Sequence, residues 1–296
     1  MQQTLRKAVS LEGKGLHTAR YARIRLCPAP PDTGIVFVRT DLGGASVPSC
    51  AASVSATCRC TTLSADGAEI GTVEHLLSAL SALGVDNAFV ETDNVEIPIL
   101  DGSAKPFAEA VRAAGITAQG APRRFLRLSE TLEISDSASG AQLRFEPSDH
   151  LSVELEVAFG QLVQTVRWDP SEPYATAIAP ARTFVFFREI EALSRAGLIR
   201  GGDLGNAVVV VDAGVTQEEV DALAQGLGMA SLPVRDGVLG NTVPRFPDEC
   251  ARHKLLDLLG DLSLAGAPLR ARVTAVKPGH TLNTRAAAVL AKLLEK

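Results

Sequence analysis

The pattern of hydrophobic and polar residues occurs twice along this chain, once in each half. In the first half, short alternating runs predict strands, and apolar residues at helical spacing predict two helices. Gly84 and Gly115 end the two helical stretches, as glycine commonly does at a helix C-terminus. The predicted elements, in chain order, are strands at residues 22–26 and 35–39, a helix at 73–83, a strand at 88–91 and a helix at 107–114.

The second half also begins with strands and ends with a helix, a strand, a loop and a helix. Its predicted elements are strands at residues 125–128, 132–134, 142–145 and 152–157, a helix that begins near Phe246, a strand at 269–276 and a helix at 282–294. Residues 116–124 are rich in turn formers and lose the periodicity. We therefore predict two domains, residues 1–120 and 124–296.

The two halves resemble each other most where the central helices begin. His75 and His253 each start an apolar helical stripe, which ends at Gly84 in one half and at Gly260 in the other. Chance is the alternative explanation, because helices rich in Leu and Ala look alike. The second half also contains an additional segment of predicted helices and a strand, which we interpret as an αβ insertion near residues 184–245. Its predicted elements are a helix at 187–196, a strand at 207–211 and a helix at 217–227.

Composition limits the class of protein. Of the 296 residues, 46% are hydrophobic and 21% are charged, a balance typical of soluble globular proteins. The formal net charge of -5 argues against a nucleic-acid partner. No apolar run approaches the roughly 20 residues that cross a bilayer, and the first residues lack the apolar core of a signal peptide. Five cysteines, an odd number, favour reduced thiols, so we expect a cytoplasmic protein.

The candidate chemistry lies at the two histidines that start the central helices. His253 and Asp257 are four residues apart, so a helix presents both side chains on one face. Together with His75 they form a set of two imidazoles and one carboxylate, which leaves a tetrahedral metal ion one open position for water. Glu74 would then lie beside that water as a base. The spacing predicts a metal-dependent hydrolase and leaves its substrate open.

Each of these residues also has a plainer interpretation. A histidine at a helix start is commonly a capping or packing residue. Asp257 and Asp261 also fit a solvated polar stripe on the helix, together with Arg252 and Lys254. His280 follows Pro and Gly in a strand-to-helix loop, a mobile position suited to an acid or base, although the same motif can be a simple turn.

Other motifs carry weaker signals. His17 in GKGLHT and the glycine-rich residues 201–206 do not match a phosphate-binding loop, and a plain turn is the better interpretation of residues 201–206. His150, between predicted strands, is interpreted as a surface residue. Cys58 and Cys60, with a third cysteine nearby, leave a zinc or redox site as a minor alternative, because no second closely spaced pair exists.

Six sequence blocks together resemble the bacterial UDP-3-O-acyl-N-acetylglucosamine deacetylase family. In chain order they are GKGLHT, TVEHLLSALSALGVDN, EIPILDGSAKPF, ARTFVF, RHKLLDLLGDL and KPGHTLNTRAAAVL. The resemblance implies an α+β fold of two similarly folded domains, each a helix pair packed on a mostly antiparallel sheet, with the active site between them. It implies hydrolysis of the N-acetyl group of UDP-3-O-acyl-N-acetylglucosamine, which gives the free amine and acetate in the committed step of lipid A synthesis.

The resemblance also implies roles for individual residues. The metal would be zinc, with iron(II) compatible with the same donors, and its ligands would be His75, His253 and Asp257. The catalytic residues would be Glu74 as general base, His280 as general acid, Asp261 as the group that orients His280, and Thr183 as a donor to the oxyanion. The substrate contacts would be Lys254, Phe184, Leu16 and Cys60. The partner would be a UDP-linked acylated amino sugar, and the protein a monomer.

Two segments depart from the family pattern. After residue 157 the chain reads AFGQLVQTV, where the family has a Phe-x-His-Pro sequence. Residues 214–245 are longer than usual and add the helix-like TQEEVDALAQGL. Both lie in the second half, where the family builds its acyl-chain passage, and we expect residues 184–211 to supply a wall of that passage. The alternative function is a non-catalytic or repurposed paralogue that binds or deacetylates another amidosugar.

Overall fold

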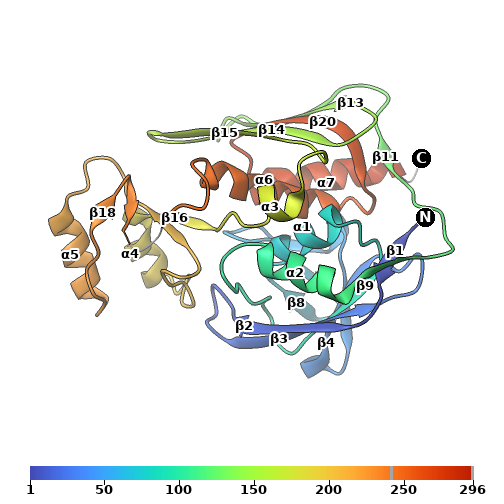
Figure 1. Ribbon diagram of the computed structural model, residues 1–296, viewed down its shortest axis with the longest axis horizontal. Coiled ribbons are helices and arrows are strands. Elements are labelled where there is room, and N and C mark those ends of the chain that lie inside the picture. The colour runs from blue at the N-terminus through green and yellow to red at the C-terminus, as the bar shows by residue number, and fades with distance from the viewer. Residues whose placement is uncertain (241–242, 295–296) are drawn as a thin grey trace.

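The chain folds into two outer sheets with helices between them (Figure 1). This computed structural model describes residues 1–240 and 243–294. One outer sheet comes from the first half of the chain and the other from the second half, and the helices of both halves meet in the middle. In the described part of the chain, no helix is long and apolar enough to cross a membrane.

The first half is built on a five-stranded sheet. Its strand order is β2 (Val9–Lys14), β3 (Tyr21–Pro28), β9 (Ala88–Thr92), β4 (Ile35–Arg39) and β5 (Ala45–Pro48). The β4–β9 pair is parallel and the other pairs are antiparallel. Its helices are α1 (Glu74–Ala82) and α2 (Lys105–Ala114). Smaller elements are β1 (Gln3–Leu5) with β10 (Ile116–Ala118), the sheet β6 (Val54–Ala56), β7 (Thr62–Ala65) and β8 (Ala68–Ile70), and the turns η1 (Thr40–Leu42) and η2 (Ala51–Ser53).

The second half repeats this sheet strand by strand. Its order is β12 (Leu132–Asp136), β13 (Ala141–Pro147), β20 (Leu269–Val276), β14 (Ser152–Phe159) and β15 (Leu162–Trp168), and β11 (Leu126–Arg127) adds to β20. The β14–β20 pair is parallel, as β4–β9 is in the first half. Its helices are α6 (Glu249–Ser263), α7 (His280–Leu294) and the short α3 (Tyr174–Ala177). The expected α+β fold and the internal repeat are therefore confirmed.

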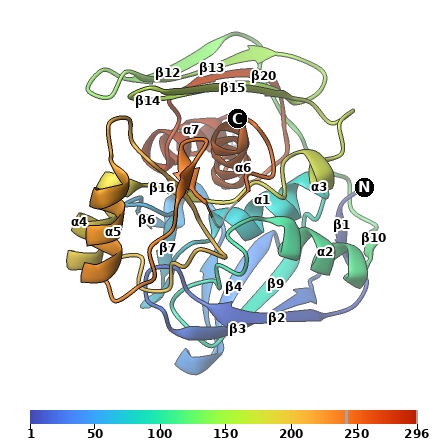
Figure 2. The ribbon, with the colours of Figure 1, turned by 60° about the vertical axis from the view of Figure 1, so that its left-hand side comes forward.

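A smaller unit extends from the second half between α3 and α6. It has a mixed sheet in the order β16 (Phe184–Phe186), β17 (Val208–Val210), β19 (Val238–Leu239) and β18 (Val234–Arg235). Its helices are α4 (Phe187–Arg195) and α5 (Gln217–Gly226). A core of its own, formed by Phe187, Val209, Val220 and Leu239, is separate from the main core. Figure 2 brings this insertion forward and shows α4 and α5 together on its outer side.

The strands and helices form where the hydrophobic pattern places them. In β3, Ala22, Ile24 and Leu26 are buried and the intervening arginines are exposed, which is the period of a half-buried strand. Helix α1 packs against α6 and α2 and is buried from Glu74 to Leu80. Because nearly every side of α1 faces protein, its polar side chains need partners inside the protein.

Several predicted boundaries differ from the observed ones by a few residues, and two of these lie near the candidate chemistry. Helix α6 begins at Glu249, three residues after Phe246, because the proline at 247 disfavours helical backbone in the residue before it. Helix α7 begins at His280 rather than at residue 282, and the Asn283 amide already donates to the Gly279 carbonyl at 2.9 Å. His280 is therefore a buried helix-start residue and not a mobile loop position.

The contact between the two halves depends on a glycine. A Cβ atom added at Gly260 in α6 would lie 2.1 Å from the carbonyl oxygen of Glu74 in α1. That oxygen belongs to the backbone, so the clash cannot be relieved by rotating a side chain. Only glycine lets the two helices approach this closely at the residue that precedes His75.

We expect Gly260→Ala to lower the free energy of unfolding by about 1–3 kcal/mol, the usual cost of overpacking. Gly226→Ala in α5 is the matched control, since a Cβ there meets open space. Because alanine is favoured in helices, the control should be neutral or gain up to about 1 kcal/mol. Urea titration of both variants measures this. Equal stability of the two would contradict the close approach of α1 and α6.

Candidate active site

The histidine-bearing helices place three buried side chains together. His75 comes from the first turn of α1, and His253 and Asp257 are one turn apart on α6. The Nε2 atoms of His75 and His253 lie 3.6 and 3.4 Å from Oδ1 of Asp257. Two atoms that share a tetrahedral zinc ion, each about 2.0–2.1 Å from it, are separated by about 3.4 Å. The cluster therefore has the dimensions of a metal site.

The hydrogen bonds around this cluster also suit a metal. Oδ1 of Asp257 is buried without a hydrogen-bond partner, which is rare for a polar atom unless it meets a ligand. Lys254 Nζ donates to the other Asp257 oxygen at 2.8 Å. Nδ1 of His253 lies 3.1 Å from the Ala181 carbonyl, which directs Nε2 toward the cluster. Burial, then the charge of His253, lowers the pKa of His75 to about 3, so this imidazole is neutral as a ligand must be.

Glu74 lies beside the cluster with a strongly perturbed carboxyl group. Its Oε2 accepts a hydrogen bond from the Thr61 amide at 3.0 Å, and its Oε1 lies 3.9 Å from Nε2 of His280. Burial raises the pKa of Glu74 to about 7, although the charge of His280 opposes this. A carboxylate that titrates near neutrality can both accept and release a proton there.

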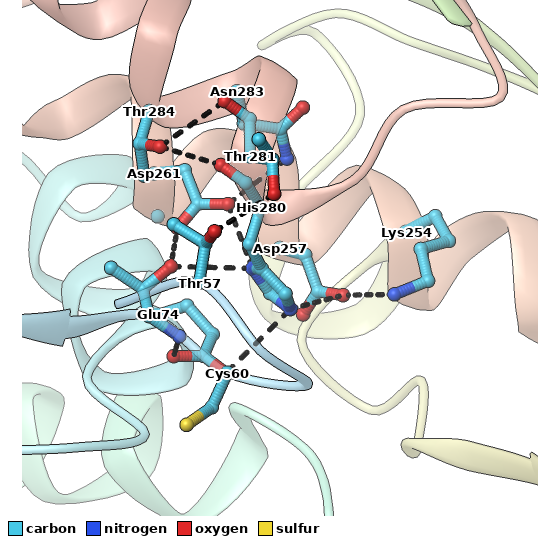
Figure 3. A network of polar contacts seen from close by, with 12 residues as sticks. Thr57, Cys60, Glu74, Lys254, Asp257, Asp261, His280, Thr281, Asn283 and Thr284 are labelled. Carbon is cyan, nitrogen blue, oxygen red and sulfur yellow. Dashed lines mark hydrogen bonds and ion pairs between the residues drawn. The ribbon is translucent and has the colours of Figure 1, made fainter. Parts of the chain in front are cut away.

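His280 faces Glu74, and its pKa is also raised, by a charged neighbour rather than by burial. Its Nδ1 lies 2.9 Å from Oδ2 of Asp261, which also accepts from Asn283 Nδ2 at 2.9 Å, while Thr61 Oγ1 donates to Oδ1 at 2.6 Å. Burial acts to lower the pKa of His280, but the charge of Asp261 and this hydrogen bond outweigh it and raise the pKa to about 9. Figure 3 shows the His280 imidazole between Asp261 and Glu74. At neutral pH the imidazole is a cation.

The remaining predicted site residues lie around the cleft, which has a volume of about 490 Å³. Leu16, Thr183 and Phe184 line both the cleft and an apolar cavity inside the insertion, so they stand where the two spaces meet. Lys254 lines the cleft, with its ammonium 5.6 Å from the centre of the Phe184 ring. Cys60 is buried near Glu74 and is not a wall residue; burial raises the pKa of its thiol to about 12.

Sequence reasoning missed several residues of this cleft. Thr61 contacts Glu74, Asp261 and His280, yet no motif marks it because the chain brings it in from an irregular turn. Asn283 could have been found, since it lies three residues after His280 on the same helix. Exposed basic side chains also line the cleft: Arg59, Lys277 and Arg285.

The structure contradicts one of the plainer interpretations of these motifs and agrees with others. Asp257 and Asp261 are buried, so they are not part of a solvated polar stripe. Residues 201–206 form a turn and His150 is exposed, as expected. Among the described residues, no group of three or more metal-type side chains other than His75, His253 and Asp257 occurs, and all cysteines are free. The cysteine motif therefore has no third ligand.

The fold and the cleft define an α+β protein of two repeated halves with a buried two-histidine, one-aspartate cluster at their interface. The sequence model described as "LpxC: UDP-3-O-acyl N-acetylglycosamine deacetylase" matches residues 2–225 and 220–292. The chain belongs to this family.

Several relatives resemble the whole chain. The UDP-3-O-acyl-N-acetylglucosamine deacetylase of Myxococcus xanthus is 42% identical, covering 95% of this chain and 83% of its own length. The enzyme of the same name from Chromobacterium violaceum is 40% identical and is covered over 90% of its length. The bifunctional enzyme LpxC/FabZ of Porphyromonas gingivalis is 40% identical over all of this chain, which spans only 65% of that longer protein.

We expect the purified protein to bind about one divalent metal ion per chain, because two imidazoles and one carboxylate converge within 4.8 Å of one another. His253→Ala should lose this ion, since it removes one ligand and the hydrogen bond to Ala181. His150→Ala, at an exposed site, is the control and should keep it. Elemental analysis after dialysis measures the content. Full metal content in His253→Ala would assign the ion to another site.

Proposed function

We propose that this protein is a zinc-dependent deacetylase, with iron(II) as the alternative ion. It hydrolyses the N-acetyl group of UDP-3-O-acyl-N-acetylglucosamine to the free amine and acetate, in lipid A synthesis. One observation carries the proposal: a metal-type cluster and an acid–base pair share a cleft that joins an apolar cavity. The names of the related enzymes from Myxococcus and Chromobacterium support the substrate.

His75, His253 and Asp257 would hold the metal ion. When bound, a zinc ion acts as a Lewis acid on water and on a carbonyl oxygen. The chain supplies neutral imidazoles for it, because burial lowers the pKa of both His75 and His253. Lys254 binds the second Asp257 oxygen and so holds the carboxylate with Oδ1 toward the two imidazoles.

The proton transfers fall to Glu74 and His280. Glu74, as a carboxylate, takes a proton from the water that attacks the acetyl carbon. His280, as an imidazolium, gives a proton to the departing glucosamine nitrogen, which is a poor leaving group until it is protonated. Asp261 keeps His280 charged and directed. Thr183 stands at the cleft wall, and its hydroxyl donates to the developing oxyanion, a type of interaction worth about 3–4 kcal/mol in other enzymes.

The remaining surfaces of the cleft suit the rest of the substrate. Exposed Lys277 and Arg285 offer positive charge for a diphosphate, whereas Arg59 is paired with Glu189 at 2.7 Å. The cavity of the insertion is lined mainly by apolar side chains, including Phe187, Leu223 and Leu232, and suits a fatty acyl chain. Both halves of the site come from one chain and all cysteines are free, which supports a monomer in the cytoplasm.

We expect the rate of deacetylation to follow a bell-shaped pH profile. Turnover needs Glu74 without its proton and His280 with one, so activity falls below about 7 and above about 9, the pKa values of the two groups. In Asp261→Asn the loss of negative charge lowers the pKa of His280, and the basic limb should move down by about one unit or more. Asp149→Asn, at an exposed carboxylate, is the control. A basic limb that does not move would exclude His280 as the acid.

The acyl chain should control the rate of deacetylation. At about 0.8 kcal/mol per methylene, four buried methylenes contribute ~3 kcal/mol, or roughly a hundredfold in kcat/KM. UDP-3-O-acyl-N-acetylglucosamine and UDP-N-acetylglucosamine are compared by acetate release, with Glu74→Ala, which should keep its metal, as the blank. Equal kcat/KM for the two would favour a repurposed deacetylase of a simpler amide, and no acetate from either would favour a non-catalytic paralogue.

A further inference from the structure

The two ends of the insertion meet at one buried carboxylate, Glu249. This residue is the first of α6, one turn before His253. Its Oε1 accepts from the Arg182 amide at 3.0 Å and from Arg182 Nε at 2.8 Å. Its Oε2 accepts from Arg182 Nη2 at 3.1 Å and from the Arg245 amide at 2.6 Å. Arg182 lies just before the insertion and Arg245 at its end, so one side chain clamps both.

Arg182 closes the clamp from the other side. Its Nη2 also donates to the Val243 carbonyl at 2.9 Å, so the guanidinium spans both ends of the insertion. Arg245 extends the network to the first half of the chain, because its Nη1 donates to Asp101 Oδ2 at 2.9 Å. We call Arg182 and Glu249 the insertion clamp.

The residues on either side of Arg182 face the candidate active site. The Ala181 carbonyl is the partner of His253 Nδ1, at 3.1 Å. Thr183 lines the cleft, and its backbone is held by Gly102 on one side and by Val208 of the insertion on the other, at 2.7 and 2.8 Å. A displacement of Arg182 would therefore move the acceptor of a metal-type histidine and the proposed oxyanion donor together.

The burial of this pair indicates a role other than stability. Arg182 and Glu249 are nearly inaccessible to solvent. Replacement of a buried ion pair by apolar side chains is often neutral or stabilising, so a hydrophobic pair would close the insertion as well. An apolar pair could not accept from two backbone amides. The four hydrogen bonds to Glu249 fix the orientation of the backbone at Arg182 and Arg245 relative to α6, and apolar packing alone would not.

We propose that Arg182 and Glu249 are positioning residues that fix the acyl-binding insertion and Thr183 relative to His253. The proposal rests on the function proposed above. The clamp keeps the apolar cavity and the cleft in one relative position. Binding of the acyl chain in the cavity therefore also positions the acetyl group in the cleft for reaction. Loss of the clamp should reduce the advantage of the acylated substrate even when the protein is folded and holds its metal.

The test is the double variant R182M/E249M, which removes both charges and leaves neither unpaired. We measure its thermal midpoint, its metal content and the ratio of kcat/KM for the acylated and non-acylated UDP sugars. The metal content should stay close to that of the parent, and the midpoint should fall by only about a few degrees, because the amides of Arg182 and Arg245 lose their acceptor. The ratio should fall at least tenfold. A parental ratio in the folded double variant would overturn the proposal.

The control is R123M/D86M, which removes another ion pair between distant segments, with Arg123 Nε and Asp86 Oδ1 at 2.8 Å. Neither residue lines the cleft or the apolar cavity, so the ratio should not change. Should R182M/E249M not fold, Glu249→Asp keeps the charge, shortens the side chain by one methylene and takes its place. The ratio should again fall at least tenfold, and a parental ratio would again overturn the proposal.

The proposed function fails if the parent protein releases no acetate from either substrate, and this outcome is distinct from a failure of the clamp. The clamp is then tested by metal affinity in competition with a chelator. Loss of the Ala181 acceptor position should weaken zinc binding about tenfold in Glu249→Asp, as changes behind a metal ligand commonly do. Unchanged affinity in that case would exclude the positioning role.

Discussion

The close contact of α1 with α6 is the constraint on which the rest of the molecule depends. It joins the two repeated halves, and Gly260 permits it by leaving room for the Glu74 backbone. The same contact places His75 beside His253 and Asp257 in a region closed to solvent. Burying so many polar groups is costly unless each finds a partner. The hydrogen bonds of Thr61, Asn283, Lys254 and the Ala181 carbonyl supply most of them.

The pKa values of Glu74 and His280 are both raised, but by different causes. Both groups lose water, which favours the neutral state in each. Asp261 makes the difference, because it lies against His280 and its second oxygen is held by Thr61. One buried carboxylate thus keeps an imidazolium charged next to a carboxylate that titrates near neutrality. The pair has the two protonation states that amide hydrolysis requires.

The sequence could predict what depends on local spacing. Asp257 lies one helical turn after His253, and the strand and helix order of both halves follows from periodicity. The prediction that His75 meets His253 depended on the internal repeat. The roles proposed for Thr183 and Leu16 depended on the family resemblance. Thr61 could not be found, because a threonine in a turn becomes important only when tertiary folding brings α6 and α7 to it. The strands β6, β7 and β8 are three or four residues long, too short for a periodic signal.

The longer of the two departures from the family pattern, residues 214–245, lies in the insertion, and the structure gives a physical reason. The insertion has its own core, so residues there can change without disturbing the packing of α1 against α6. The extended segment after residue 214 contributes Leu227, Met229 and Leu232 to the apolar cavity, and none of its described residues lines the polar cleft. Changes in this segment therefore alter the lining of the apolar cavity and leave the contacts of Glu74 and His280 untouched. The apolar cavity and the polar cleft are connected where Arg182 and Glu249 hold the insertion, one residue from Thr183 and one turn from His253.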